Sequence, residues 1–295
     1  MLFRLTATLV AVIAVSAARV AALGGEPVVH RDLEYAERED AAASQTSLDL
    51  YAPENAKNCP IVVWVHGGGW RIGDKRMVNH KPVAFGDRGI ILASINYRLQ
   101  PATDYRGQAT DVADAVRWLA DHAEVYGGDS QRMILMGHSA GAHLAALAVA
   151  DAEYLKKAGV ERESVCGVVL LDGAGYDVEQ QMKQVQLMPR LGRLYHDAFG
   201  DEPAAWRDAS PIHHVKDSQD YPPFLILHVA SRPDSGRQSR ALAEKLVAAG
   251  GQAEAVPCEG KTHATINREF GLGEDAPTKA AMEFIDEAFA LQRPK

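Results

Sequence analysis

The sequence predicts an α/β fold with a mainly parallel sheet that is covered by helices on both faces. Short, continuously apolar and β-branched runs, such as residues 61–65 and 165–171, are typical of strands buried on both faces. Segments with apolar residues at helical spacing, such as residues 104–122 and 235–249, separate these runs. This alternation predicts a parallel sheet, in which sites form at the carboxyl ends of the strands.

Further elements complete the alternation. Half-exposed strands are expected at residues 28–36 and 45–51, where apolar and polar residues alternate as in an antiparallel pair. The other predicted strands are residues 89–96, the run that starts at 132, residues 222–230 and residues 252–257. The other predicted helices are residues 142–150 and 278–291.

Residues 25–295 are expected to form a single domain, with one cap-like insertion at about 176–220. This segment is polar, is dotted with large apolar and aromatic residues and contains no strand pattern. A segment of this length inside an α/β alternation is typical of a lid over a site. The alternative is that it simply contains two core helices.

Residues 1–24 have the layout of a signal peptide. Arg4 precedes an apolar, uncharged run at 5–18, and small residues then offer cleavage points. The run is too short to span a bilayer comfortably, so we expect export to the periplasm or the medium without stable membrane insertion after cleavage. An uncleaved anchor is the alternative.

Composition excludes several kinds of partner and site. The net charge is −8 and the sequence contains no basic stripe, so a nucleic-acid partner is not expected. The three cysteines, Cys59, Cys166 and Cys258, lie at strand edges and outside any metal-ligand cluster. Neither a disulfide scaffold nor a metal site is therefore expected, although one disulfide remains open.

The pattern Gly-x-Ser-x-Gly at residues 137–141 has Ser139 at its centre. It stands between a buried strand and a buried helix, which is the context that this motif requires. The tight turn projects the serine hydroxyl clear of the sheet, and the flanking glycines avoid clashes where the strand doubles back into the helix. Ser139 is therefore the candidate nucleophile.

A serine nucleophile needs a base and an acid that orients the base. His263 lies in a loop after the last strand and is the candidate base. Asp234, just past the strand that ends at Ala230, is the preferred acid, and Asp172, at the end of the preceding strand, is its rival. Both candidates give the chain order serine, acid, histidine.

Backbone N–H groups must also stabilise the oxyanion. The glycine run after residues 61–65 predicts Gly68 and Gly69 as donors, and Ala140, at a helix start, as a third. Trp70 is a candidate for the pocket wall. A phosphate-binding turn is disfavoured because neither phosphate-loop pattern follows.

These residues together resemble the α/β-hydrolase superfamily. His66-Gly-Gly-Gly-Trp70 and the serine motif are similar to those of HGG-type esterases, which include hormone-sensitive-lipase-like carboxylesterases and bacterial feruloyl or acetyl esterases. The segment Asn96-Tyr97-Arg98-Leu99 resembles one that these families carry after the following strand. The resemblance implies an eight-stranded sheet, no cofactor and acyl-enzyme chemistry. Tyr97 and His138 are further candidates for the substrate pocket, although His138, which flanks a glycine, could instead support the turn.

The chain departs from its relatives around the acid. Many relatives have Asp followed by x-x-Val-Pro, whereas Asp234 is followed by Ser-Gly-Arg-Gln. Arg232, Arg237 and Arg240 near this loop could bind an acidic group of the substrate or could be surface charges.

The sequence therefore predicts an exported serine esterase that acts on small-molecule esters, with short acyl or carbohydrate-linked esters as the expected class. An arylformamidase would use the same residues, and such enzymes carry His-Gly-Gly-x-Trp, which Trp70 matches. The pattern is also compatible with a peptidase of this fold and with a non-catalytic binding protein.

Overall fold

The structure is a computed structural model, and it describes residues 26–185, 189–217, 220–273 and 275–291 of the chain. The predicted signal peptide, residues 1–24, lies outside the described residues, and so do residues 186–188 and 218–219 of the predicted insertion. In the part of the chain that is described, no helix combines the length and the apolar character that a membrane span needs.

The described residues form one eight-stranded sheet, as expected. Its strands lie in the order β1-β2-β4-β3-β5-β6-β7-β8. The pairs β1–β2 and β2–β4 are antiparallel, and the remaining neighbours are parallel. The strands are β1 (Val28–Glu34), β2 (Ser47–Ala52), β3 (Cys59–Val65), β4 (Ile91–Ile95), β5 (Gly128–His138), β6 (Val165–Leu171), β7 (Phe224–Val229) and β8 (Ala253–Cys258).

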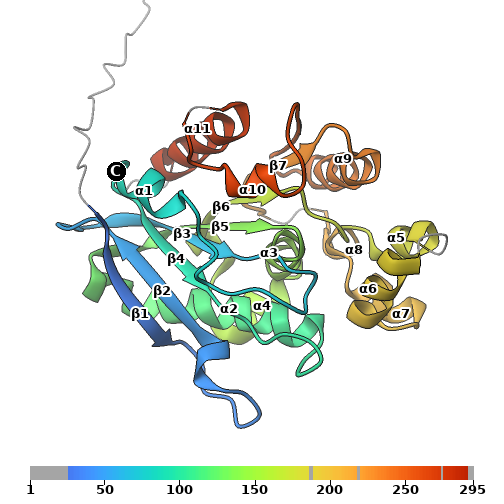
Figure 1. Cartoon of the computed structure of the whole chain (residues 1–295), viewed down its shortest axis with the longest axis horizontal. Helices are drawn as coiled ribbons and strands as arrows, with labels where there is room; N and C mark the ends of the chain where they lie inside the picture. The colour runs from blue at the N-terminus through green and yellow to red at the C-terminus, as the bar shows by residue number, and fades with distance from the viewer. Residues whose placement is uncertain (1–25, 186–188, 218–219, 274, 292–295) are drawn as a thin grey trace, which may run out of the picture.

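Helices cover both faces of the sheet (Figure 1). Buried side chains of α2, α3 and α9 belong to the core on one face, and those of α1 and α11 belong to the core on the other. The α-helices of the described chain are α1 (Lys81–Gly86), α2 (Tyr105–His122), α3 (Ala140–Ala150), α4 (Ala152–Ala158), α5 (Val178–Val185), α6 (Pro189–Phe199), α7 (Pro203–Asp208), α8 (Pro211–His214), α9 (Pro233–Ala248), α10 (Thr265–Arg268) and α11 (Ala276–Leu291).

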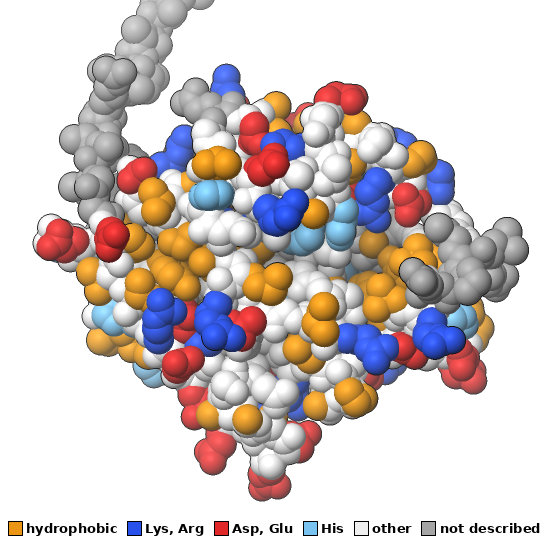
Figure 2. Space-filling view, in the orientation of Figure 1, with side chains coloured by type: hydrophobic (Ala, Val, Ile, Leu, Met, Phe, Trp, Pro, Cys, Tyr) orange, Lys and Arg blue, Asp and Glu red, His pale blue; other side chains and the backbone are white. Residues whose placement is uncertain are grey.

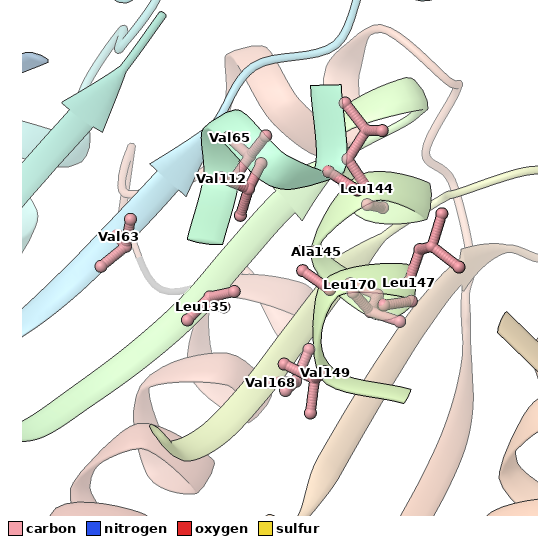
Figure 3. Close-up of a cluster of buried hydrophobic side chains, with 14 of the residues drawn as sticks. Val63, Val65, Val112, Leu135, Leu144, Ala145, Leu147, Val149, Val168 and Leu170 are labelled. Atoms are coloured by element: carbon pink, nitrogen blue, oxygen red, sulfur yellow. The ribbon is translucent and has the colours of Figure 1, made fainter. Parts of the chain in front are cut away.

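The core around α3 fills the space above the centre of the sheet. Every residue of α3 is buried, and Leu144 and Leu147 pack among valines and leucines of β3, β5 and β6 (Figure 3). Along β3 the side chains alternate between the two cores, with Val63 and Val65 on the α3 side and Trp64 on the other. This packing fixes the strand ends at which the site residues lie.

The predicted insertion is helical. It contains α5, α6, α7 and α8 between β6 and β7, and no strand occurs among its described residues. Phe199 of α6 packs edge-on against Trp70, so the insertion contacts the glycine loop after β3. The short helices α1, α4 and α10 were not predicted. Each spans two turns or fewer, so its sequence carries little helical periodicity.

Candidate active site

Ser139 occupies a sharp turn between β5 and α3. Its backbone has φ 54° and ψ −119°, a conformation that few residues other than glycine adopt. The flanking glycines are required because the turn leaves no space for side chains. A Cβ on Gly137 would lie 2.4 Å from the carbonyl oxygen of Gly141, and a Cβ on Gly141 would lie 2.1 Å from that of Val65. Close backbone packing on both sides therefore holds Ser139 in this strained conformation.

His263 lies after β8, in the loop before α10, and reaches Ser139 across the edge of the sheet. Its Nε2 is 2.9 Å from Ser139 Oγ, and its Nδ1 is 2.6 Å from Asp172 Oδ2. These three side chains come from positions up to 124 residues apart in the chain. With a proton on Nδ1, His263 donates to the carboxylate and can accept the serine proton at Nε2.

Asp172 follows the last residue of β6 and is fully buried, with 0% of its surface exposed. Its Oδ1 accepts from the backbone N–H of Val229, at 3.0 Å, and from Ser235 Oγ, at 2.7 Å. Its Oδ2 accepts from His263 and from Nη1 of Arg232. A buried carboxylate is tolerated only with partners of this kind.

These partners also set the ionisation of Asp172. Burial alone would raise its pKa. The hydrogen bond to His263 and the positive charge of Arg232 outweigh burial, with smaller contributions from Ser235 and Val229, and hold the pKa of the carboxyl well below its usual range. Asp172 is therefore an anion wherever His263 acts as a base.

The preference for Asp234 as the partner of His263 is corrected by this geometry. Asp234 lies in the first turn of α9, beyond the end of β7, and is partly exposed. Asp172 lies one strand nearer to Ser139 than Asp234 does, because β6 pairs directly with β5, the strand that leads to Ser139. Sequence order could not separate the two acids, since both follow Ser139 and precede His263.

The glycine run after β3 lies directly beside the serine. A Cβ on Gly67 would be 3.1 Å from Cβ of Ser139. Gly68 and Gly69 have φ values of 132° and 58°, which favour glycine. Within the described chain, the N–H groups of Gly68, Gly69 and Ala140 have no hydrogen-bond acceptor. They are therefore free to bind an oxyanion.

The structure places Trp70, Tyr97 and His138 behind the site rather than in an open pocket. Trp70 is 2% exposed, and its Nε1 donates to Nδ1 of His143 at 3.2 Å. The hydroxyl of Tyr97 donates to the carbonyl of His66 at 2.9 Å, at the start of the glycine run. Both side chains thus support that loop.

His138 supports the loop that carries His263. Its Nε2 donates to the carbonyl of His263 at 2.8 Å, and the two rings are 4.6 Å apart. Burial, together with the neighbouring His263, lowers the pKa of His138 to about 3. His138 is therefore a neutral donor at the pH at which His263 would act.

The contacts of Arg232 with Asp172 and His263 are not predicted from the sequence. Besides its bond to Asp172, its Nη1 lies 2.7 Å from Nδ1 of His263. The position of Arg232, just past the end of β7 at Val229, could have indicated a contact with the side chains at the neighbouring strand ends. Arg232 was interpreted only as a substrate-binding or surface charge.

Two further observations concern metal ligands and cavities. Among the residues that the structure describes, no group of three or more histidine, cysteine, aspartate or glutamate side chains could hold a metal ion, and the three cysteines are unpaired. A cavity of about 560 Å³ lies between the start of α2 and helices α6 and α7. Its lining includes Arg71 and Phe199 but not Ser139, so it is not the space around the serine.

The surface near these elements carries charges of both signs. Figure 2 shows acidic and basic side chains intermixed over the visible face, with histidine beside Lys or Arg near its middle. This face of the described chain has no broad basic stripe.

Comparisons with known proteins agree with the fold. The chain is 30% identical over 257 residues to the probable isoprenylcysteine alpha-carbonyl methylesterase ICMEL1 of Arabidopsis thaliana, covering 81% of this chain and 52% of that protein. It is 32% identical over 229 residues to Esterase LipQ of Mycobacterium tuberculosis, covering 70% and 54%. The chain thus spans about half the length of the curated relatives it matches.

Among solved structures, Esterase B of Lactobacillus rhamnosis superposes with a TM-score of 0.75 at 24% identity, covering 90% of this chain and 89% of that one. The model of the BD-FAE family matches residues 48–246, which include Ser139, Asp172 and the glycine run. The predicted resemblance to α/β-hydrolase esterases is therefore confirmed, and the chain belongs to the BD-FAE family of the α/β-hydrolase superfamily.

Proposed function

We propose that this protein is a carboxylic ester hydrolase that acts through an acyl-enzyme on Ser139. The observation that carries the proposal is the unbroken contact from Ser139 Oγ to His263 Nε2, at 2.9 Å, and from His263 Nδ1 to Asp172, at 2.6 Å. The free N–H groups beside the serine and the esterase names of the relatives support it.

In the first half-reaction, His263 removes the proton from Ser139 as the hydroxyl oxygen attacks the ester carbonyl. Asp172 keeps the proton of His263 on Nδ1 and stabilises the imidazolium. The developing oxyanion binds the N–H groups of Gly68, Gly69 and Ala140. His263 then returns its proton to the alcohol, which leaves Ser139 acylated.

In the second half-reaction, water takes the place of the alcohol. His263 removes a proton from this water, which attacks the acyl carbonyl, and the same N–H groups bind the second oxyanion. His263 then returns the proton to Ser139 Oγ as the carboxylic acid leaves. The buried carboxylate of Asp172 carries the same role in both steps.

The catalytic acid in this proposal is Asp172, not Asp234. The substrate class remains the one expected from the sequence, short acyl or carbohydrate-linked esters.

Steady-state hydrolysis of p-nitrophenyl acetate by the wild type and by Ser139→Ala tests the proposal. We expect kcat to fall by about 10⁴-fold or more, because the nucleophile is lost. Equal activity in the two proteins would overturn the proposal. A panel of acetylated sugars, p-nitrophenyl esters of increasing acyl length and N-formylaniline then tests the substrate class, and hydrolysis of the formamide alone would contradict it.

A further inference from the structure

We propose that Arg232 is a positioning residue that aims the Asp172 carboxylate at His263 and limits the protonation of His263 between turnovers. This inference rests on the proposed ester hydrolase function. It assigns a role to the one cation that touches both the acid and the base in the described chain.

Arg232 stands at the end of β7, immediately before α9. Its Nη1 donates to Oδ2 of Asp172, the same oxygen that His263 contacts, and lies 2.7 Å from His263 Nδ1. The Arg232 side chain is 30% exposed whereas that of Asp172 is 0% exposed, so Arg232 covers the buried carboxylate from the solvent side.

The three groups cannot all bond at once. A protonated Nδ1 of His263 donates to Asp172 and cannot accept from Arg232. An unprotonated Nδ1 accepts from Arg232, but the proton is then on Nε2, where His263 cannot take the proton of the serine. The carboxylate therefore favours the tautomer with the proton on Nδ1, which can accept the serine proton at Nε2. Arg232 is compatible with this tautomer only while it donates to Asp172.

The charge of Arg232 has a second consequence. A buried anion 2.6 Å from the ring favours the imidazolium, and an imidazolium cannot act as a base. A cation beside the same ring atom opposes that effect. The charge of Arg232 thus opposes that of Asp172 at the ring, while His263 itself loses its proton to the alcohol or to Ser139 Oγ in each half-reaction.

The other groups around His263 do not supply this balance. His138 of β5 is held neutral, with its pKa lowered to about 3 mainly by burial, and Lys81 lies behind it, bonded to Asn267. From the α3 side the ring meets the Ser139 hydroxyl. On its own loop Lys261 is paired with acidic side chains of the α10–α11 segment, Glu269 and Asp275.

The test compares Arg232→Gln, Arg232→Lys and the matched control Arg240→Gln. Arg240 is exposed on α9, and no hydrogen bond or ion pair in the described chain joins it to Ser139, Asp172 or His263, so its variant removes the same charge without breaking the contacts of Arg232. For Arg232→Gln we expect kcat to fall by roughly 10- to 100-fold with little change in KM. The acidic limb of the kcat/KM profile should move to higher pH by about one unit, because the imidazolium loses its opposing charge.

The lysine variant separates charge from geometry. Arg232→Lys keeps the charge but loses the planar donor group, so we expect the limb to stay near its wild-type position while kcat falls partway. Arg240→Gln should match the wild type in kcat, KM and profile. Thermal unfolding of each variant identifies any loss of activity that follows loss of the fold.

An NMR titration of the His263 ring in a Ser139→Ala background gives a readout that is independent of turnover. The midpoint of this titration should rise when Arg232→Gln is added. This expectation does not depend on ester hydrolysis: a wild type that hydrolyses no ester would overturn the proposed function but not the role of Arg232. A midpoint and a pH profile that coincide with those of Arg240→Gln would overturn the role of Arg232. A raised KM with kcat and profile unchanged would also overturn it and indicate substrate binding instead.

Discussion

The ends of β6 and β7 each lead to an aspartate, but the two carboxylates are in different surroundings. Asp172 directly follows β6, is fully buried and accepts from a backbone N–H and from three side chains. Asp234 is reached only after a turn, in the first helical turn of α9, where it is partly exposed. Only the first arrangement fixes a carboxylate firmly enough to hold an imidazole in one orientation.

The comparison also shows what β7 contributes. The end of β7 and the start of α9 supply the partners of Asp172 rather than the acid itself: the N–H of Val229, the guanidinium of Arg232 and the hydroxyl of Ser235. The two strand ends thus act together, with the anion on one strand and its donors on the next. Replacing Asp172 should therefore affect activity far more than replacing Asp234.

The largest difference is expected between Asp172→Asn and Asp234→Asn. An amide at 172 can donate to His263 and so favours the unproductive tautomer, which should lower kcat by about 10³- to 10⁴-fold. Asp234→Asn should change kcat by no more than about twofold, as surface substitutions do. Steady-state hydrolysis of p-nitrophenyl acetate by both variants measures this. Equal losses, or a greater loss at Asp234, would reverse the assignment of the acid.

A smaller effect is expected on stability in acid. The folded pKa of Asp172 is depressed, so its contribution to the free energy of unfolding is fully present above the unfolded pKa of about 3.9 and is lost as pH falls toward the folded pKa. The Tm of Asp172→Asn should therefore decline less steeply below about pH 4 than that of the wild type. Asp234→Asn serves as the control and should follow the wild-type slope. A slope for Asp172→Asn as steep as that of the wild type would contradict the ion-pair account.

The fold and the sharp turn at Ser139 are predictable from the sequence because their signals are local. Continuous β-branched runs such as residues 61–65 mark strands that are buried on both faces, and the structure places β3 there. The turn around Ser139 requires glycine on both sides, and that requirement is visible as spacing. His263 followed because it lies in a loop at the end of the last strand.

The carboxylate that contacts His263 is not predictable from the sequence, because that contact depends on distance across the sheet. Asp172 and Asp234 satisfy the same order along the chain, and only the pairing of β6 with β5 decides which one reaches His263. Trp70 and Tyr97 illustrate the same limit. Both are candidates for the substrate pocket from the sequence, but their side chains turn inward and support the glycine loop.

The central claim is that Ser139 is a nucleophile activated by His263 and Asp172, and labelling by a fluorophosphonate tests it most directly. Intact-mass spectrometry of the wild type should show one adduct, and peptide mapping should place it on Ser139. Asp172→Asn should label far more slowly than Asp234→Asn, and Ser139→Ala should not label. An adduct on Ser139→Ala at the wild-type rate, or no adduct on the folded wild type, would contradict the account.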